Sequence, residues 1–161
     1  MTKRANITAK DDKGLTALHE AARHHREDAA QDVVKLLHSE GADVNAKDAK
    51  GCTALHHCAS QNRKGPVSLL MAWGVDVHAK CNKGYTAIME AACNGFKDIV
   101  ELLISNGAEV NAEGESTLYH AACGGSIHVM HLLLSAGADV DAHNLKGETA
   151  LYEAARSGET W

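Results

Sequence analysis

A six-residue phrase recurs along this chain at a nearly fixed interval. It reads Gly-Ala-Asp-Val-Asn-Ala at 41–46, and altered copies follow at 74–79, 107–112 and 137–142. The first three copies begin 33 residues apart, and the last interval is 30 residues. A period of this length is typical of stacked supersecondary units that bury their apolar faces only against their neighbours. We therefore expect a solenoid.

Each unit is expected to contain two helices. The first carries one large apolar residue and then two adjacent small ones, such as Ala21-Ala22, which let neighbouring helices approach closely. Aligned by unit, the large residues are Leu18, Leu55, Ile88, Leu118 and Leu151. The second helix has apolar residues at helical spacing, as in residues 33–37, which predicts a buried stripe. It ends near the glycine of the repeated phrase, which suits a left-handed C-cap.

Turn residues separate the units. The segment 45–51 reads Asn-Ala-Lys-Asp-Ala-Lys-Gly, and Thr-Ala-Leu-His follows at 53–56. On these motifs the chain resembles the ankyrin repeat family over essentially its whole length. The resemblance implies a mainly α ankyrin-repeat solenoid of stacked helix-turn-helix units with β-hairpin fingers between them. One departure is the missing proline of Thr-Pro-Leu-His, which removes some preorganisation at the helix starts.

We interpret residues 1–161 as a single ankyrin repeat domain. Its units are approximately 5–41, 42–74, 75–107, 108–137 and a partial unit at 138–161. The chain opens in a finger and closes after the first helix of the fifth unit. We therefore expect a segment of a longer array; the alternative is a short protein with half-unit caps.

Two units break the period. The first has four extra residues between its helices, around 24–31, and the finger leading into the fourth is three residues short at 113–116. We expect no proper hairpin there and a notch in the row of fingers.

Composition restricts the function. A formal net charge of -5 argues against nucleic acid as a partner, and no apolar run approaches the roughly 20 residues of a membrane span. The five cysteines are odd in number and form no Cys-x-x-Cys pair, which favours a reducing compartment. We expect a cytoplasmic or nuclear protein that is monomeric or part of a longer chain.

Catalytic and metal-binding motifs are weak. His19 and His24 are five residues apart, whereas a zinc-protease helix needs histidines at i and i+4. Cys52, His56, His57 and Cys58 have suitable ligand types for zinc. However, the resemblance places His19 and His56 where the imidazole bonds the finger backbone. We predict no enzymatic activity, no cofactor and no metal ion.

The resemblance also implies a protein-binding groove, formed by finger tips and by residues that follow the small pair. Carried over by position, the predicted contact residues are Asp12, Leu15, Arg23, His24, Lys50, Cys52, Gln61, Asn82, Lys83, Tyr85, Cys93, Asn94, Glu115 and Cys123. We expect most of the binding energy from Tyr85, Leu15, Arg23 and Asn94.

The first three fingers carry paired lysines. The pairs are Lys10 and Lys13, Lys47 and Lys50, and Lys80 and Lys83, whereas the short finger has Glu113 and Glu115. One interpretation is a basic ridge that meets an acidic segment of a protein partner. The other is that these lysines only keep the protein soluble.

The predicted function is a non-catalytic protein-protein interaction module: an adaptor, scaffold or inhibitor. The alternatives are a regulatory or substrate-recruiting domain of a larger enzyme and a structural spacer in a longer array.

Three further residues have two interpretations. Asn45 and Asn111 fit a site of asparaginyl hydroxylation implied by the resemblance, or they only stabilise their turns. Trp73 is either an anchor for a neighbouring domain or a cover for a helix end.

Overall fold

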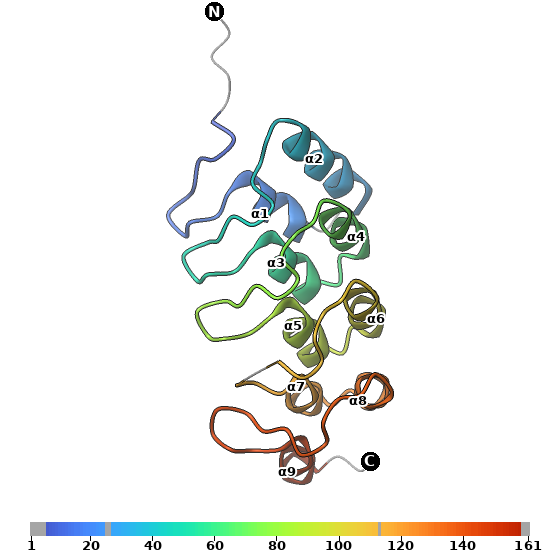
Figure 1. Cartoon of the computed structure of the whole chain (residues 1–161). Coiled ribbons are helices and arrows are strands. Elements are labelled where there is room, and N and C mark those ends of the chain that lie inside the picture. Colours follow the sequence, from blue (N-terminus) through green and yellow to red (C-terminus); the bar gives the residue numbers. More distant parts are fainter. Residues whose placement is uncertain (1–5, 25–26, 113, 159–161) are drawn as a thin grey trace, which may run out of the picture.

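The computed structural model describes residues 6–24, 27–112 and 114–158, and this part of the chain contains nine α-helices. In chain order they are α1 (Ala17–Arg23), α2 (Glu27–Ser39), α3 (Ala54–Ser60), α4 (Lys64–Ala72), α5 (Ala87–Cys93), α6 (Lys97–Ser105), α7 (Thr117–Cys123), α8 (Ile127–Ser135) and α9 (Ala150–Ser157). The first helices of the units stack in one column and the second helices in another, with the fingers on the far side of the first column (Figure 1). The fold is therefore a mainly α solenoid, as predicted.

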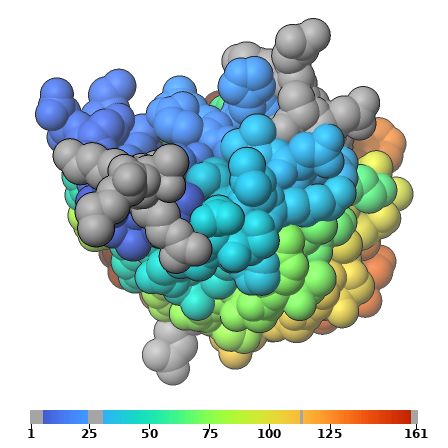
Figure 2. Space-filling model, turned by 90° about the horizontal axis from the view of Figure 1, so that it is seen from above, coloured from blue at the N-terminus to red at the C-terminus, as the bar shows by residue number. Residues whose placement is uncertain are grey.

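The units lie behind one another when the molecule is viewed from its N-terminal end (Figure 2). We number the fingers by their residues: finger 1 (9–15), finger 2 (46–52), finger 3 (79–85), finger 4 (112–115) and finger 5 (142–148).

The repeated motifs set the helix ends. Thr16 and Thr53 are N-caps, and each forms a capping box with the histidine three residues later. After the second helices the repeated glycine takes a positive φ, for example +88° at Gly41. The next residue then bonds back to the helix, as Ala42 N–H does to Leu37 O at 2.9 Å. The predicted left-handed C-caps are confirmed.

The core runs continuously through the units. Leu18, Leu55, Ile88 and Leu118 are each 1% exposed, and the small residues after them pack against the neighbouring first helices. Leu151 occupies the same position in α9 but is 62% exposed. No second helix of the fifth unit lies within the described residues to cover it.

The fingers differ from the predicted β-hairpins, because the described residues contain no β-strand and only one isolated bridge, His143 to Thr149. Each long finger is a turn with two backbone hydrogen bonds, as where Gly51 N–H donates to Asp48 O at 3.0 Å inside the turn and Asp48 N–H donates to Cys52 O at 2.9 Å to close it. The Asp48 carboxylate supports this turn by accepting from the N–H groups of Lys50 and Cys52 at 2.8 and 2.9 Å. One closing pair is too short a ladder to form strands.

The two irregular units are visible in the structure. Helix α2 has 13 residues, whereas α4, α6 and α8 have nine each, so part of the first unit's insertion extends its second helix. His25 and Arg26, also in that insertion, lie outside the described residues, as does Glu113 of finger 4. The described part of finger 4 makes no closing backbone pair like that of the other fingers.

Candidate protein-interaction surface

In each of the first two units, one buried histidine joins the unit to the next finger. His19 Nδ1 accepts from Thr16 N–H at 3.1 Å, and its Nε2 lies 3.1 Å from Cys52 O. His56 repeats this arrangement with Thr53 N–H at 3.2 Å and Tyr85 O at 3.0 Å. Because Nδ1 accepts, the proton is on Nε2, which donates to the carbonyl. The predicted contact between these imidazoles and the finger backbone is confirmed.

Burial lowers the pKa of both His19 and His56, although the carbonyl that each faces acts in the opposite direction. Each ring is therefore neutral at neutral pH and serves as a structural bridge. This environment leaves neither nitrogen available for a metal ion.

Backbone hydrogen bonds connect the first three finger tips. Ala49 N–H donates to Lys13 O at 3.0 Å, and Asn82 N–H donates to Lys50 O at 2.9 Å. The row of fingers is thus a rigid edge in this half of the molecule.

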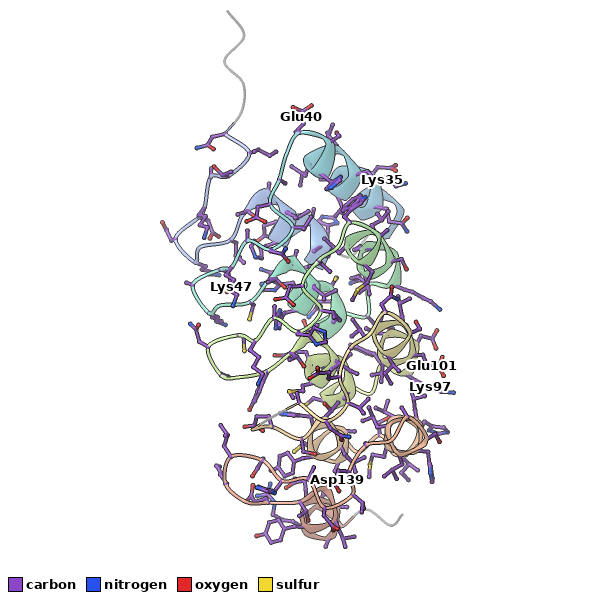
Figure 3. All side chains as sticks on the ribbon, viewed as in Figure 1. Lys35, Glu40, Lys47, Lys97, Glu101 and Asp139 are labelled. Carbon is purple, nitrogen blue, oxygen red and sulfur yellow. The ribbon has the colours of Figure 1, made fainter. Side chains whose placement is uncertain are left out.

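The paired lysines have two different roles. The ammonium groups of Lys10 and Lys47 donate to the carbonyl oxygens of Lys47 and Lys80, at 2.8 and 3.1 Å. Lys47 in Figure 3 belongs to finger 2 and lies next to finger 3. The second lysines of the pairs, Lys13, Lys50 and Lys83, are exposed at the tips. Only these tip lysines form a candidate basic ridge.

A cavity of about 450 Å³ lies between fingers 2 and 3 and the helices behind them. We call it the groove cavity. Four predicted contact residues line it: Lys50, Cys52, Asn82 and Lys83. The helices add His57, Ser60 and Glu90, and finger 3 adds Cys81. The lining is therefore basic at the finger tips and more acidic towards the helices.

A buried carboxylate supports one wall of the groove cavity. His57 Nε2 lies 2.9 Å from Asp48 Oδ2, and the Asp48 side chain is 3% exposed. Burial alone would raise the pKa of Asp48, but the N–H donors of Cys52, His57 and Lys50 outweigh it and lower the pKa. The carboxylate therefore stays ionised and fixes the His57 ring beside the cavity.

The thiols of Cys52, Cys93 and Cys123 are not activated. All five cysteines are free. Burial raises the pKa of Cys52 to about 12, helped by the nearby Asp48 charge, and it also raises the pKa values of Cys93 and Cys123. These groups remain protonated at neutral pH, so they offer contact surface and no nucleophile.

Tyr85 is fixed by its neighbours. Its ring meets the His120 ring edge-on with centroids 4.5 Å apart, and the Tyr85 side chain is half-buried. His120 is buried, with Nε2 3.5 Å from a Glu115 carboxylate oxygen. Burial lowers the pKa of His120, and Glu115 opposes the shift. Tyr85 therefore presents a preorganised ring at the edge of the groove.

The structure argues against two of the fourteen predicted contact residues. Leu15 is 6% exposed and Glu115 is 9% exposed. Leu15 closes finger 1 through its backbone, and the Glu115 carboxylate faces His120. Neither side chain can serve as a primary anchor, and Glu115 gives no acidic finger tip.

The other twelve are exposed or half-buried. Asp12, Arg23, His24, Lys50, Gln61, Asn82, Lys83, Cys93, Asn94 and Cys123 are exposed, and Cys52 and Tyr85 are half-buried.

Sequence reasoning missed one repeated position, which places two residues in the wall of the groove cavity. The residue after the fourth position of the Thr-Ala-Leu-His motif is Glu20, His57, Glu90, His120 or Glu153 in successive units, although only the first two units have histidine at the fourth position. His57 and Glu90 line the groove cavity, and Glu153 binds Arg156 and lies 3.5 Å from the Tyr119 hydroxyl. The alternation of glutamate and histidine at this position was the signal that could have revealed it.

Trp73 covers a helix end. Its ring stacks on His38, with centroids 3.9 Å apart and planes 2° from parallel. This contact supports the second interpretation of that residue.

The two candidate hydroxylation sites hold turns together. Asn45 Oδ1 accepts from Asp76 N–H and Asn111 Oδ1 from Asp139 N–H, both at 2.8 Å. Each asparagine thus has a structural role between units, whatever modification it carries.

No cluster of three or more histidine, cysteine or acidic residues arranged to hold a metal ion occurs among residues 6–24, 27–112 and 114–158. In the same ranges, no helix has the length and apolarity needed to cross a membrane.

Stacked helix pairs with a continuous core, joined in the first units by histidine bridges and backbone-linked fingers, define a repeat protein of the helical solenoid class. The family model described as "Ankyrin repeats (3 copies)" matches residues 29–113 and 109–161, which is more than half of the chain. The chain therefore belongs to the ankyrin repeat family, whose repeats generally act as protein-protein interaction modules. A comparison with curated proteins gave no match.

Proposed function

We propose that this chain is a non-catalytic protein-protein interaction module that binds a protein partner along the groove cavity and the finger tips. The main support is the contrast between two kinds of position. Residues that pack the units together recur: Leu18, Leu55, Ile88 and Leu118 occupy the same buried position in successive units. Residues that face the groove change: Cys52, His57 and Ser60 of the second unit correspond to Tyr85, Glu90 and Cys93 of the third.

The charges indicate what the partner carries. The exposed Lys13, Lys50 and Lys83 follow one another along the finger tips, while Glu90 lines the cavity on the helix side. A segment with carboxylates directed at the tips is complementary to this edge, and such complementarity mainly raises the association rate and specificity.

The rigid fingers favour tight binding. Because fingers 1–3 are already linked by backbone hydrogen bonds, a partner need not order them on docking. The same display suits an adaptor, a scaffold or an inhibitor.

The test is comparative affinity capture from native cell extract. The bait variants are the unchanged protein, the Tyr85→Ala, Arg23→Ala double variant and a control, Lys97→Ala, Glu101→Ala. The control residues form a 3.4 Å ion pair on α6, on the side away from the fingers (Figure 3). Near-UV and far-UV circular dichroism would verify that each bait is folded.

A protein captured by the unchanged bait and the control, but lost with the Tyr85/Arg23 variant, would support groove binding. Identical captures by all three baits would contradict the proposal and favour a structural spacer.

A further inference from the structure

The hydrogen bonds between fingers follow a rule that one finger breaks. In fingers 1–3, each tip N–H donates to the tip-lysine carbonyl of the preceding finger: Ala49 to Lys13 at 3.0 Å and Asn82 to Lys50 at 2.9 Å. A complete array would continue this pattern from finger 3 to finger 4 and from finger 4 to finger 5.

Finger 4 lacks the residues that would make these backbone hydrogen bonds to fingers 3 and 5. Aligned with finger 2, its three-residue deletion removes the positions of Asp48, Ala49 and Lys50. Consequently the Lys83 carbonyl and the Leu145 N–H, which the missing residues would have paired, make no hydrogen bond within the described part of the chain. Figure 1 shows the connection before α7 between the longer fingers that precede α5 and α9.

The gap contains a cavity of about 620 Å³ between fingers 4 and 5. Gly114 lies in its wall, where an added Cβ would be 3.6 Å from Leu145 Cδ2, so the leucine side chain leans over the shortened finger. Leu145 is nevertheless 73% exposed. The charged carboxylates in the lining are Asp139 and Asp141, and no lysine or arginine of the described residues lines the cavity.

We propose that this notch, lined by Gly114, Leu145, Asp139 and Asp141, forms together with the Lys83 carbonyl of finger 3 a docking site for a reverse turn of the protein partner that carries a lysine or arginine. The turn replaces the missing finger tip: its N–H donates to Lys83 O, and its carbonyl accepts from Leu145 N–H. Its cationic side chain lies against Asp139 and Asp141, and its backbone packs on Leu145. This inference rests on the proposed interaction function and adds a second contact outside the groove cavity.

The chemistry of the notch favours a polypeptide. The two unpaired groups are one backbone acceptor and one backbone donor, which the N–H and carbonyl of two successive turn residues can satisfy, as those of Ala49 and Lys50 do in finger 2. Carboxylates in the lining repel phosphate, so nucleic acid and anionic lipid are poor occupants.

The probe is a cyclised peptide with this chain's own finger sequence, Ala-Lys-Asp-Ala-Lys-Gly (residues 46–51), titrated into ¹⁵N-labelled protein. We expect saturable amide shifts at Gly114 and Leu145. A peptide with both lysines replaced by glutamate should bind at least about tenfold more weakly, the equivalent of about 1.4 kcal/mol. Absence of shifts at Leu145 would overturn the proposal.

A variant in which the notch is filled provides the second part of the test. Inserting Asp-Ala-Lys between Glu113 and Gly114 rebuilds a full finger, and it should abolish peptide binding. The Asp139→Asn, Asp141→Asn variant keeps the Asn-type turn chemistry and should weaken binding by the loss of charge alone. Undiminished binding to either folded variant would overturn the proposal.

Sedimentation tests whether the notch binds a finger from a second copy of this chain instead of a turn of another protein. If the unchanged protein self-associates and the filled-notch variant does not, the notch receives a second copy's finger and the partner-turn assignment is wrong. Neither the peptide titration nor sedimentation depends on the groove, so the notch can fail while groove capture succeeds, and the reverse.

Discussion

The imidazole of His56 donates from Nε2 to the backbone oxygen of Tyr85 at 3.0 Å, so a helix of the second unit holds the finger of the third. The same ring accepts from Thr53 N–H at 3.2 Å and caps its own helix. One side chain thus couples a helix start, a finger and a ring at the edge of the groove.

His56→Ala should destabilise the protein strongly. The change leaves the buried Thr53 N–H and the Tyr85 carbonyl without their partner and removes a side chain that is 2% exposed. We expect a loss of about 2–4 kcal/mol in the free energy of unfolding, measured by urea denaturation. His128→Ala, at an exposed position of α8, is the control and should change it by less than about 0.5 kcal/mol. An equal change in the free energy of unfolding for the two variants would contradict the role of His56 as a bridge between its helix and the next finger.

Stability should fall on mild acidification. The pKa values of His19, His56 and His120 are lowered in the folded state. Below about pH 6.5, the ordinary histidine pKa, the unfolded chain therefore binds protons that the folded chain does not. The free energy of unfolding should decrease from pH 7 towards pH 5, by at most about 1.4 kcal/mol per pH unit for each histidine. A constant or rising value over this range would refute the neutral, buried state of these rings.

Gly124→Ala should destabilise the contact between α5 and α7. A Cβ at Gly124 would overlap the backbone carbonyl of Cys93, which cannot move as a flexible side chain could. We expect a cost of about 1–3 kcal/mol. Gln61→Ala, at the equivalent and exposed position after α3, provides a matched comparison in the same denaturation experiment. A harmless Gly124→Ala would show that the first helices lie farther apart than described.

Reversing the tip lysines should slow association with the partner. The Lys13→Glu, Lys50→Glu, Lys83→Glu variant changes only exposed groups, whereas Lys10 and Lys47 hold neighbouring carbonyls and are left unchanged. Surface plasmon resonance at low salt should show an association rate reduced by about tenfold or more, and the difference should shrink as salt rises. Lys35→Glu, on α2, is the control. An unchanged association rate would leave these lysines with a solubility role only.

The sequence predicted the elements that depend on local chemistry. Gly41 needs a positive φ, Thr53 and His56 form a capping box, and Leu55 is buried because its helix has one apolar face. The glycine and the buried apolar residue repeat in the first four units because each of these units packs against the same kind of neighbour.

The sequence did not predict features that depend on packing between units. Leu15 was expected to face a partner, yet it is buried at the end of its finger. His57 and Asp48 lie nine residues apart and meet only because the finger folds back on α3. The β-hairpins were inferred from resemblance, but a single closing pair such as Asp48 to Cys52 does not build strands.

The most direct test of the central claim is hydrogen–deuterium exchange on the complex with the captured partner. Binding at the groove cavity and finger tips predicts slower exchange in residues 47–61 and 80–94. Exchange in α4, α6 and α8, on the side away from the fingers, should not change. Protection confined to those second helices would contradict the account, because the partner would then bind the opposite side of the solenoid.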